Sequence, residues 1–460
     1  MDRELVGLAG LGVFFVLLML RVPVGLAMLA VGIGGNYALS IVAPFLRFEP
    51  YLSTFKTLTW STVANYDLSV VPLFVLMGYL AAQANLSRDL FEGINALAGR
   101  MRGGVAVAAV AACGAFGAVC GSSLATASTM GKVALPELRR LHYAPRLATG
   151  ALAAGGTLGI LIPPSIALVI YAIIVEASVI EMFQAALLPG LLAVGFFVAV
   201  ILVSVRRAPH LAPEAAAVTG PARRTALLRL LPVIGLFGAI ILGLGLGLFT
   251  PTPAAAVGVA AVLLYGLALR AFGRGLTGRG LRTALLETAS TSAMIYFILF
   301  GAEVLKGFFA RAGLPALVSA WAAETGLDPW TVLVAILAVL ILLGCVMESL
   351  SMILVVVPFF WPVLVELNGG DWVTAETAAY GLTSNDLKIW FGILALIVVE
   401  LGLITPPVGL NVFIIHSLAR DVPMRDVFRG VLPFFGVELL RVALILAIPG
   451  IALALPRLLD

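Results

Sequence analysis

Uncharged, apolar segments long enough to cross a lipid bilayer recur along almost the whole chain. A membrane-spanning helix needs about 20 predominantly apolar residues, and runs of this order follow one another from residue 5 to residue 456. Hydrophobic residues make up 62% of the 460 residues and charged residues only 11%, whereas soluble domains carry about 25% charged residues. A transmembrane β-barrel would show short segments of alternating polarity instead. The sequence therefore predicts an all-α polytopic membrane protein surrounded by lipid.

The remaining composition excludes several classes of function. The net charge of +4 comes from arginines in short loops between apolar runs, so it indicates membrane topology, and no nucleic-acid partner is expected. The three cysteines lie inside apolar runs and the three histidines are far apart, which predicts neither disulfides nor a metal cluster. The sequence contains no Walker A motif and no His-Glu-x-x-His motif. We expect a transporter, not an enzyme, driven by an ion gradient or by another chain.

Two segments are predicted to enter the membrane and return on the same side. Residues 103–131 carry no charge, and two interpretations fit their length: one long helix, or two limbs that turn at 120–123. Lys and Arg on both flanks place both ends in the cytoplasm, which favours a re-entrant hairpin at about 103–138. A counterpart at about 330–366 has acidic flanks and is predicted to open to the outside.

A helix with two consecutive prolines follows each hairpin. The pairs are Pro163-Pro164 and Pro406-Pro407. A proline removes a backbone donor and disfavours helix in the residue before it. We therefore predict that 147–175 and 386–418 are broken helices with an unwound stretch, and a simple proline kink is the alternative. Unwound carbonyl groups at membrane depth are suitable ligands for a hard cation such as Na⁺.

The two halves of the chain share these features at constant spacing. Gly-x-x-x-Pro-Pro occurs at 159–164 and again at 402–407. We predict ten crossings, five in each half, with the N-terminus outside. Residues 1–205 and 230–460 would then be inverted repeats joined by a cytoplasmic linker, 206–229. Many secondary transporters are built from inverted repeats.

Polar side chains inside the apolar runs are the candidate binding groups. The first hairpin tip carries Ser122, Ser123 and Thr126, although hydroxyl residues in membranes often serve only helix packing. Glu348 at the second tip and Glu400 are carboxylates inside apolar runs, where an unpaired charge costs several kcal/mol. Either a coupling role or a structural role fits Glu400.

Four segments resemble landmarks of one transporter family in the same order. They are FGAVCGSSLATAS (116–128), the stretch 156–190 around GILIPPS, FTPTPAAAVGV (249–259) and LGLITPPVGLNVFIIHSLA (401–419). The chain resembles the large membrane subunit, DctM type, of tripartite ATP-independent periplasmic (TRAP) transporters over essentially its whole length. The resemblance implies an elevator-type Na⁺ symporter of the bacterial inner membrane that imports a small organic acid, such as a C4-dicarboxylate. It also implies a small four-helix membrane subunit, expected as a separate chain, and a periplasmic substrate-binding protein.

The resemblance also suggests residues for each site. The first Na⁺ site would contain Gly121, Ser122, Gly159, Ile162 and Pro163, and the second Glu348, Ser349, Gly402, Thr405 and Pro406. The residues expected to bind substrate are Ser123, Thr126, Ser165, Tyr171 and Asn411, with core packing an equal alternative for Tyr171.

Two departures from the family pattern affect these sites. The family usually has an acidic residue in place of Thr126 and Asp-Pro in place of Glu348-Ser349. The alternative function is a self-sufficient Na⁺-coupled anion carrier that needs no binding protein. A channel or a membrane enzyme fits less well, because the sequence shows neither a symmetric filter sequence nor clustered catalytic residues.

Overall fold

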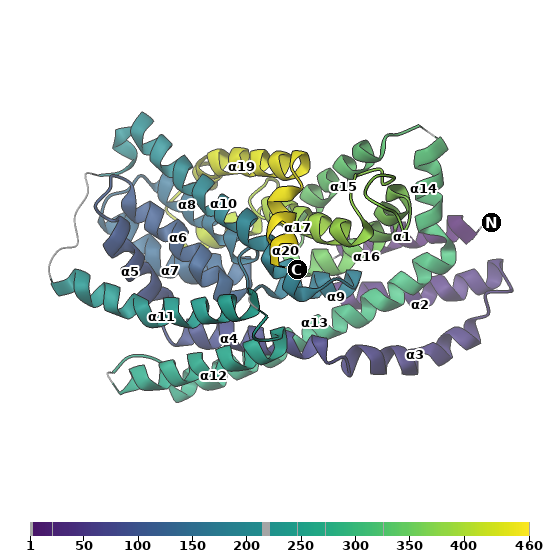
Figure 1. The fold of residues 1–460 in the computed structure, drawn as a ribbon, viewed down its shortest axis with the longest axis horizontal. Coiled ribbons are helices and arrows are strands. Elements are labelled where there is room, and N and C mark those ends of the chain that lie inside the picture. Colours follow the sequence, from purple (N-terminus) through teal and green to yellow (C-terminus); the bar gives the residue numbers. More distant parts are fainter. Residues whose placement is uncertain are drawn as a thin grey trace.

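Every regular element of the described chain is a helix, as predicted (Figure 1). The structure, a computed structural model, describes residues 3–20, 22–213, 221–245, 247–271, 273–324 and 326–459, so part of the predicted linker 206–229 lies outside it. The helices are α1 (Arg3–Met19), α2 (Val24–Val42), α3 (Phe48–Val63), α4 (Val70–Gln83), α5 (Leu86–Ala98), α6 (Gly104–Cys120), α7 (Ser123–Arg140), α8 (Pro145–Gly156), α9 (Ile166–Val175), α10 (Val179–Arg207), α11 (Pro221–Gly245), α12 (Pro251–Arg270), α13 (Gly278–Ala312), α14 (Leu314–Glu324), α15 (Pro329–Gly344), α16 (Ser349–Asn368), α17 (Ser384–Gly402), α18 (Leu410–Leu418), α19 (Met424–Ala447) and α20 (Gly450–Leu459). Short 3₁₀ helices are η1 (Asp67–Ser69), η2 (Thr157–Gly159) and η3 (Pro209–Leu211).

Seven of the described helices are long and apolar enough to cross a membrane: α2, α10, α11, α12, α13, α16 and α19. An eighth span results if α3 and the η1–α4 segment, which meet at 55°, count as one. The chain is therefore a multi-pass membrane protein, but the number differs from the ten predicted crossings. Two predicted crossings, 147–175 and 386–418, are divided by their breaks, and two others, 5–20 and 68–84, form helices of only 17 and 14 residues. Helix α16, in contrast, is long enough to span although its residues were predicted to belong to a re-entrant hairpin.

The helices form two groups that pack against each other. Helices α2–α4 and α11–α13, which we call the peripheral group, run along the lower side of Figure 1. Within it, α13 packs against α2 and α4, and α4 packs against α12. Helices α6–α9 and α15–α18, which we call the central group, include helices that are buried over nearly their whole length, such as α6, α8 and α17. The central group thus provides an enclosed interior for irregular backbone.

Four interruptions of regular helix lie inside the central group. Helix α6 ends at Gly121, whose φ of +60° is in the left-handed region that suits glycine, and α7 begins two residues later. Residues 345–348 separate α15 from α16 in the second half. The double prolines lie between η2 and α9 and between α17 and α18, and both X-Pro bonds, 163–164 and 406–407, are cis. The breaks therefore lie where the sequence places them.

Glycines bring the broken segments into very close contact. A Cβ on Gly117 of α6 would lie 2.2 Å from the Cα atom of Gly159, at the first double-proline break. A Cβ on Gly402 would lie 2.6 Å from Gly344, so α17 and α15 meet in the same manner in the second half. Small residues allow helix backbones to approach closely in membranes. Each hairpin thus packs directly on the break that follows it.

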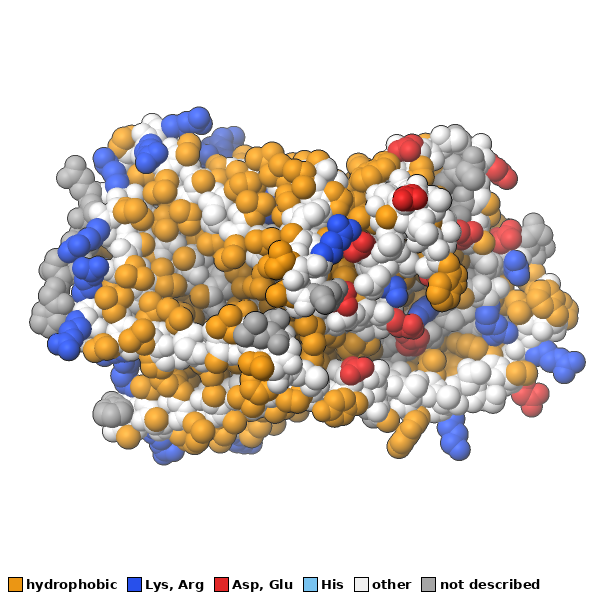
Figure 2. All heavy atoms as spheres, in the orientation of Figure 1, with side chains coloured by type: hydrophobic (Ala, Val, Ile, Leu, Met, Phe, Trp, Pro, Cys, Tyr) orange, Lys and Arg blue, Asp and Glu red, His pale blue; other side chains and the backbone are white. Residues whose placement is uncertain are grey.

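Charge is distributed unevenly over the face shown in Figure 2. Lys and Arg gather at its left end, where α11 begins and α12 ends, without Asp or Glu beside them. The Asp and Glu side chains of this face lie in its right half, together with further Lys and Arg. Hydrophobic side chains cover most of the surface between the two ends. The basic end is the natural candidate for the cytoplasmic side.

The contact between α8 and α19 generates a stability prediction. We expect Gly430→Ala to lower the free energy of unfolding by about 1–3 kcal/mol, because the added Cβ would lie 2.1 Å from the carbonyl oxygen of Arg146. Gly436→Ala on the same helix is the matched control, since nothing lies within 4 Å of its added Cβ. Thermal unfolding of the purified protein in detergent compares the two variants. Equal melting temperatures would show that the α8–α19 contact is not tight.

Candidate functional site

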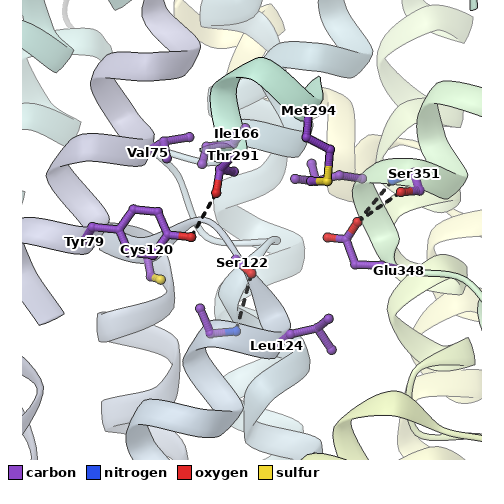
Figure 3. Close-up of a pocket in the computed structure, with 12 residues that line it drawn as sticks. Val75, Tyr79, Cys120, Ser122, Leu124, Ile166, Thr291, Met294, Glu348 and Ser351 are labelled. Carbon is purple, nitrogen blue, oxygen red and sulfur yellow. Dashed lines mark hydrogen bonds between the residues drawn. The ribbon is translucent and has the colours of Figure 1, made fainter. Parts of the chain in front are cut away.

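A cavity of about 330 Å³ lies where the two hairpin tips face the peripheral group (Figure 3). Its volume falls in the lower range of small-molecule sites. The lining residues are Val75 and Tyr79 of α4, Thr291 and Met294 of α13, Cys120, Ser122, Leu124 and Ala125 of the first hairpin, Ile166 of α9, and Glu348, Leu350 and Ser351 of the second hairpin. The cavity therefore combines apolar walls with a few hydroxyl groups and one carboxylate.

Two helix N-termini begin at this cavity. The Ser122 hydroxyl accepts a hydrogen bond from the Ala125 backbone N–H at 3.4 Å and caps α7. The Glu348 carboxylate accepts from the Ser351 N–H at 3.3 Å, caps α16, and lies across the cavity from Ser122 in Figure 3. Helix N-termini carry partial positive charge. No Lys, Arg or His is among the described residues that line the cavity, so these N-termini are its main attraction for an anion.

Free oxygen atoms converge at the first break. A Cβ on Gly159 would lie 2.7 Å from the Thr126 hydroxyl oxygen and 3.3 Å from the Ser122 carbonyl oxygen. Thr126 is fully buried and its hydroxyl has no hydrogen-bond partner among the described residues. The amide nitrogen of Asn411 lies 2.9 Å from the position of a Cβ on Gly156, and its amide oxygen is also buried without a partner. Such unpaired oxygens are suitable ligands for a cation.

The second break is bound directly to the second hairpin tip. The Gly409 N–H donates to the carbonyl oxygen of Cys345 at 3.3 Å. The single proton of the Cys345 thiol is within reach of two acceptors, the Ile341 carbonyl at 3.2 Å and the Pro406 carbonyl at 3.4 Å. Gly402 contacts Gly344 of the same hairpin. The Thr405 hydroxyl, in contrast, donates to the Leu401 carbonyl of its own helix at 2.6 Å. Gly402 and Pro406 thus lie beside the second hairpin tip, while the Thr405 hydroxyl bonds within its own segment.

Glu400 connects the two hairpins. One of its carboxylate oxygens accepts a hydrogen bond from Ser123 at 2.5 Å and the other accepts from Ser349 at 2.7 Å. All three side chains are buried. Ser123 was expected to bind substrate and Ser349 to bind Na⁺, but both hydroxyls donate to this carboxylate. Neither residue lines the cavity.

None of the five residues expected to bind substrate lines the cavity. Ser165 is fully buried and caps α9 by accepting from the Leu168 N–H. The Tyr171 hydroxyl donates to the Lys388 carbonyl at 2.7 Å and its ring packs near Phe391, so the packing alternative describes it. The physical reason is burial: these residues lie among the helices of the central group and not at the surface that faces the peripheral group.

The remaining predicted residues of the first site also turn away from the tip. The Ile162 side chain packs against Gly114 and Gly190. The Pro163 ring lies in a small apolar pocket with residues of α10 and α11. Gly121 contacts the start of α9. Of Ile162 and Pro163, only the backbone oxygens are candidate ligands.

Sequence reasoning missed the peripheral wall of the cavity. Tyr79 and Thr291 share a hydrogen bond of 3.0 Å across it, and Met294 lies beside Thr291 (Figure 3). A single hydroxyl in an apolar run has no local pattern that sets it apart. Ser351 had a usable signal, because a helix N-cap at Glu348 places its partner three residues later.

The unpaired hydroxyl of Thr126 generates a prediction for Na⁺-free buffer. We expect Thr126→Val to keep or raise the free energy of unfolding, by up to about 1 kcal/mol, because it removes a buried polar group without a partner. Thr149→Val is the control: that hydroxyl donates to the Pro145 carbonyl at 2.7 Å, and its loss should cost about 0.5–1.5 kcal/mol. Thermal unfolding in choline chloride measures both. An equal loss of stability in the two variants would contradict an unpaired Thr126 hydroxyl.

Comparison with known proteins identifies the kind of molecule to which this site belongs. Residues 11–451 match the family model described as the DctM component of tripartite ATP-independent periplasmic transporters. A C4-dicarboxylate TRAP transporter large permease protein, DctM, of Pseudomonas aeruginosa is 34% identical over 86% of this chain and 88% of its own length. A sialic acid TRAP transporter large permease protein, SiaM, of Vibrio cholerae is 31% identical over 86% of this chain and 87% of its own length.

The fold is also that of solved transporters. The YdaH transporter of Alcanivorax borkumensis has a TM-score of 0.63 at 15% identity, covering 87% of this chain and 88% of its own. MtrF of Neisseria gonorrhoeae has a TM-score of 0.53 at 14% identity, covering 86% and 83%. The relatives are named as permease subunits, so the protein is a transporter component and not an enzyme. The chain belongs to the DctM family, the large membrane subunits of tripartite ATP-independent periplasmic transporters.

Proposed function

We propose that this chain is the large subunit of a Na⁺-driven tripartite symporter that imports a small organic acid across the bacterial inner membrane. The observation that carries the proposal is the pairing of each hairpin tip with a double-proline break beside one cavity. Coupled transport requires cation and substrate sites that influence each other. Two tips that border both the cavity and a break meet this requirement.

We propose Na⁺ as the coupling ion, which is transported together with the substrate. Supporting it, the Ser122 carbonyl and the Thr126 hydroxyl lie close to Gly159, and Asn411, whose amide oxygen is buried without a partner among the described residues, packs beside Gly156 through its amide nitrogen. Hard cations prefer several oxygen ligands, and unwound backbone in a membrane supplies them. At the second break, the tip residue Cys345 contacts Pro406 and Gly409, which brings loop carbonyls of both segments together. We propose a second cation site there.

A small carboxylate fits the proposed substrate site. The cavity is bordered by the N-termini of α7 and α16. The Tyr79 and Thr291 hydroxyls share one hydrogen bond, which leaves one of their two O–H groups available as a donor. The negative charge of Glu348 would repel an anionic substrate, so we propose that a bound cation offsets the charge of Glu348 during transport. The relatives named for C4-dicarboxylate and for sialic acid transport agree with a carboxylate.

We further propose that the central group moves as an elevator against the peripheral group, and that residues 1–205 and 230–460 are inverted repeats. The cavity supports the first idea, because it lies at the boundary between the two groups. The matched hairpins and breaks of the two halves support the second. The basic end in Figure 2 supports a cytoplasmic location for the ends of α10 and α12.

The proposed partners are a small four-helix membrane subunit and a periplasmic protein that delivers the substrate. Membership in the DctM component family supports them. Exposed apolar side chains on α2 and α12, such as Ile41 and Leu264, provide membrane-facing surface for lipid and for the small subunit. A self-sufficient carrier would need neither partner, and the transport assay below separates the two.

Reconstituted transport tests the proposal. Proteoliposomes that contain both membrane subunits, with the binding protein outside, should accumulate a C4-dicarboxylate or sialic acid under an inward Na⁺ gradient. Thr126→Val removes a proposed hydroxyl ligand and keeps the backbone, so it should raise the Na⁺ concentration for half-maximal uptake about ten-fold, the effect of losing one polar contact of 1–2 kcal/mol. Thr149→Val is the matched control, because the Thr149 hydroxyl donates to the Pro145 carbonyl of its own helix and does not line the cavity.

Three outcomes would overturn parts of the proposal. Equal uptake with K⁺ in place of Na⁺ would exclude Na⁺ coupling. Uptake that persists without the binding protein would favour the self-sufficient carrier. An unchanged Na⁺ dependence of Thr126→Val would show that the Thr126 hydroxyl is not a Na⁺ ligand.

A further inference from the structure

We propose that Glu400 couples the two cation sites, so that occupation of one site organises the other. The inference rests on the proposed Na⁺ symport. It begins from one juxtaposition: the Glu400 carboxylate accepts hydrogen bonds from Ser123 of the first hairpin at 2.5 Å and from Ser349 of the second at 2.7 Å. A single buried side chain therefore connects two segments that are far apart in sequence.

Each member of this bridge adjoins a candidate Na⁺ ligand. Ser123 follows Ser122, whose carbonyl faces Gly159. Glu400 precedes by two residues Gly402, which packs on the second hairpin. A cation that fixes the first tip also fixes Ser123, and through Glu400 it fixes the start of α16. Such an effect is reciprocal, because coupling between two binding sites acts equally in both directions.

The second half of the chain supplies the bridging carboxylate, and the first half has no carboxylate at the corresponding position. Ser123 and Ser349 occupy corresponding positions, each the first residue of the second helix in its hairpin. The residue that corresponds to Glu400 in the first double-proline segment is Thr157, and its hydroxyl donates to the Ala154 carbonyl of its own helix at 2.7 Å. Two independent sites would need no such asymmetry. One carboxylate serves both hairpins.

The charge of Glu400 is not neutralised by a side chain in contact with it. Its hydrogen-bond donors are two neutral hydroxyls. The neighbouring buried cation, Arg441 of α19, donates instead to Glu438 and to the Pro189 carbonyl. A buried carboxylate is destabilised unless an opposite charge is near. Cations at the two tips are the charges that Glu400 would favour, and this is a second way in which it joins the sites.

The chain contains a natural reporter for the second tip. Cys345 is buried, and its sulfur atom lies 3.4 Å from the Pro406 carbonyl oxygen at the second break. In a variant with Cys345 as its one cysteine (Cys113→Ala, Cys120→Ala), Na⁺ bound at the second tip should slow alkylation by N-ethylmaleimide. The Na⁺ concentration for half-protection then measures that site without transport or partner proteins.

The experiment measures whether a substitution at the first tip changes Na⁺ binding at the second tip. In the Cys345 reporter chain in membrane vesicles, Thr126→Val, which removes the hydroxyl ligand proposed for the first site, should raise the Na⁺ concentration for half-protection about five-fold or more. In a Glu400→Gln background, the same Thr126→Val change should produce no further shift. Ser123→Ala gives a second background, since it removes one hydrogen bond and keeps the carboxylate and its bond to Ser349. Thr149→Val is the control and should produce no shift.

The outcomes separate this inference from the proposed function. If Na⁺ protects Cys345 no better than K⁺ in the parent chain, the proposed Na⁺ site itself is wrong. If Na⁺ protects Cys345 but Thr126→Val leaves half-protection unchanged, the two sites are independent and the coupling is wrong. If Thr126→Val shifts half-protection equally in the parent, Glu400→Gln and Ser123→Ala backgrounds, the sites are coupled by another route and Glu400 is not the bridge.

Discussion

A helix interrupted at membrane depth must be enclosed by protein, because lipid offers no hydrogen bonds to the freed backbone groups. The rest of this structure depends on that constraint. Each double-proline break is covered by the hairpin that precedes it, and glycine meets glycine at both contacts, Gly117 with Gly159 and Gly344 with Gly402. Any larger residue at these contacts would separate the segments. Close backbone approach is what allows the interruptions to exist.

The same enclosure allows oxygen atoms without helical hydrogen bonds to lie inside the protein. Helix satisfies its own carbonyl groups, whereas a break leaves oxygen atoms that face the hairpin tip. Thr126 and Asn411 add buried oxygens beside the first break. Each tip also begins a helix, so partial positive charge and free oxygens lie within one region. Under the proposed function, an organic anion and its coupling cation would bind on either side of the same tips.

Much of this arrangement could be predicted from the sequence. The double prolines locate both breaks, and Gly121-Ser122 locates the first turn, because these residues act through their own backbone. The contacts of Glu400, Tyr171 and Tyr79 could not be predicted, since each involves a residue from a distant element. The sequence shows that Glu400 lies within an apolar run. It does not show whether the partner of the Glu400 carboxylate is a cation, a substrate or two serines.

The residues expected to bind substrate stay a prediction, and they lie outside the cavity. Ser165 and Asn411 follow the breaks, so proximity along the chain suggested the cavity, but both are buried among the central helices. Distance from a break along the sequence does not determine which face of the next helix turns toward the peripheral group. The peripheral residues Thr291 and Met294 complete the cavity from helices that carry no distinguishing motif.

Direct measurement of Na⁺ binding to the purified chain tests the central claim, that the two breaks and their tips hold cations. Equilibrium binding of radioactive Na⁺ in detergent requires neither substrate nor partner proteins. The account predicts saturable, cooperative binding of more than one ion per chain, without competition from K⁺. Absence of saturable binding, or binding that K⁺ displaces equally well, would contradict it.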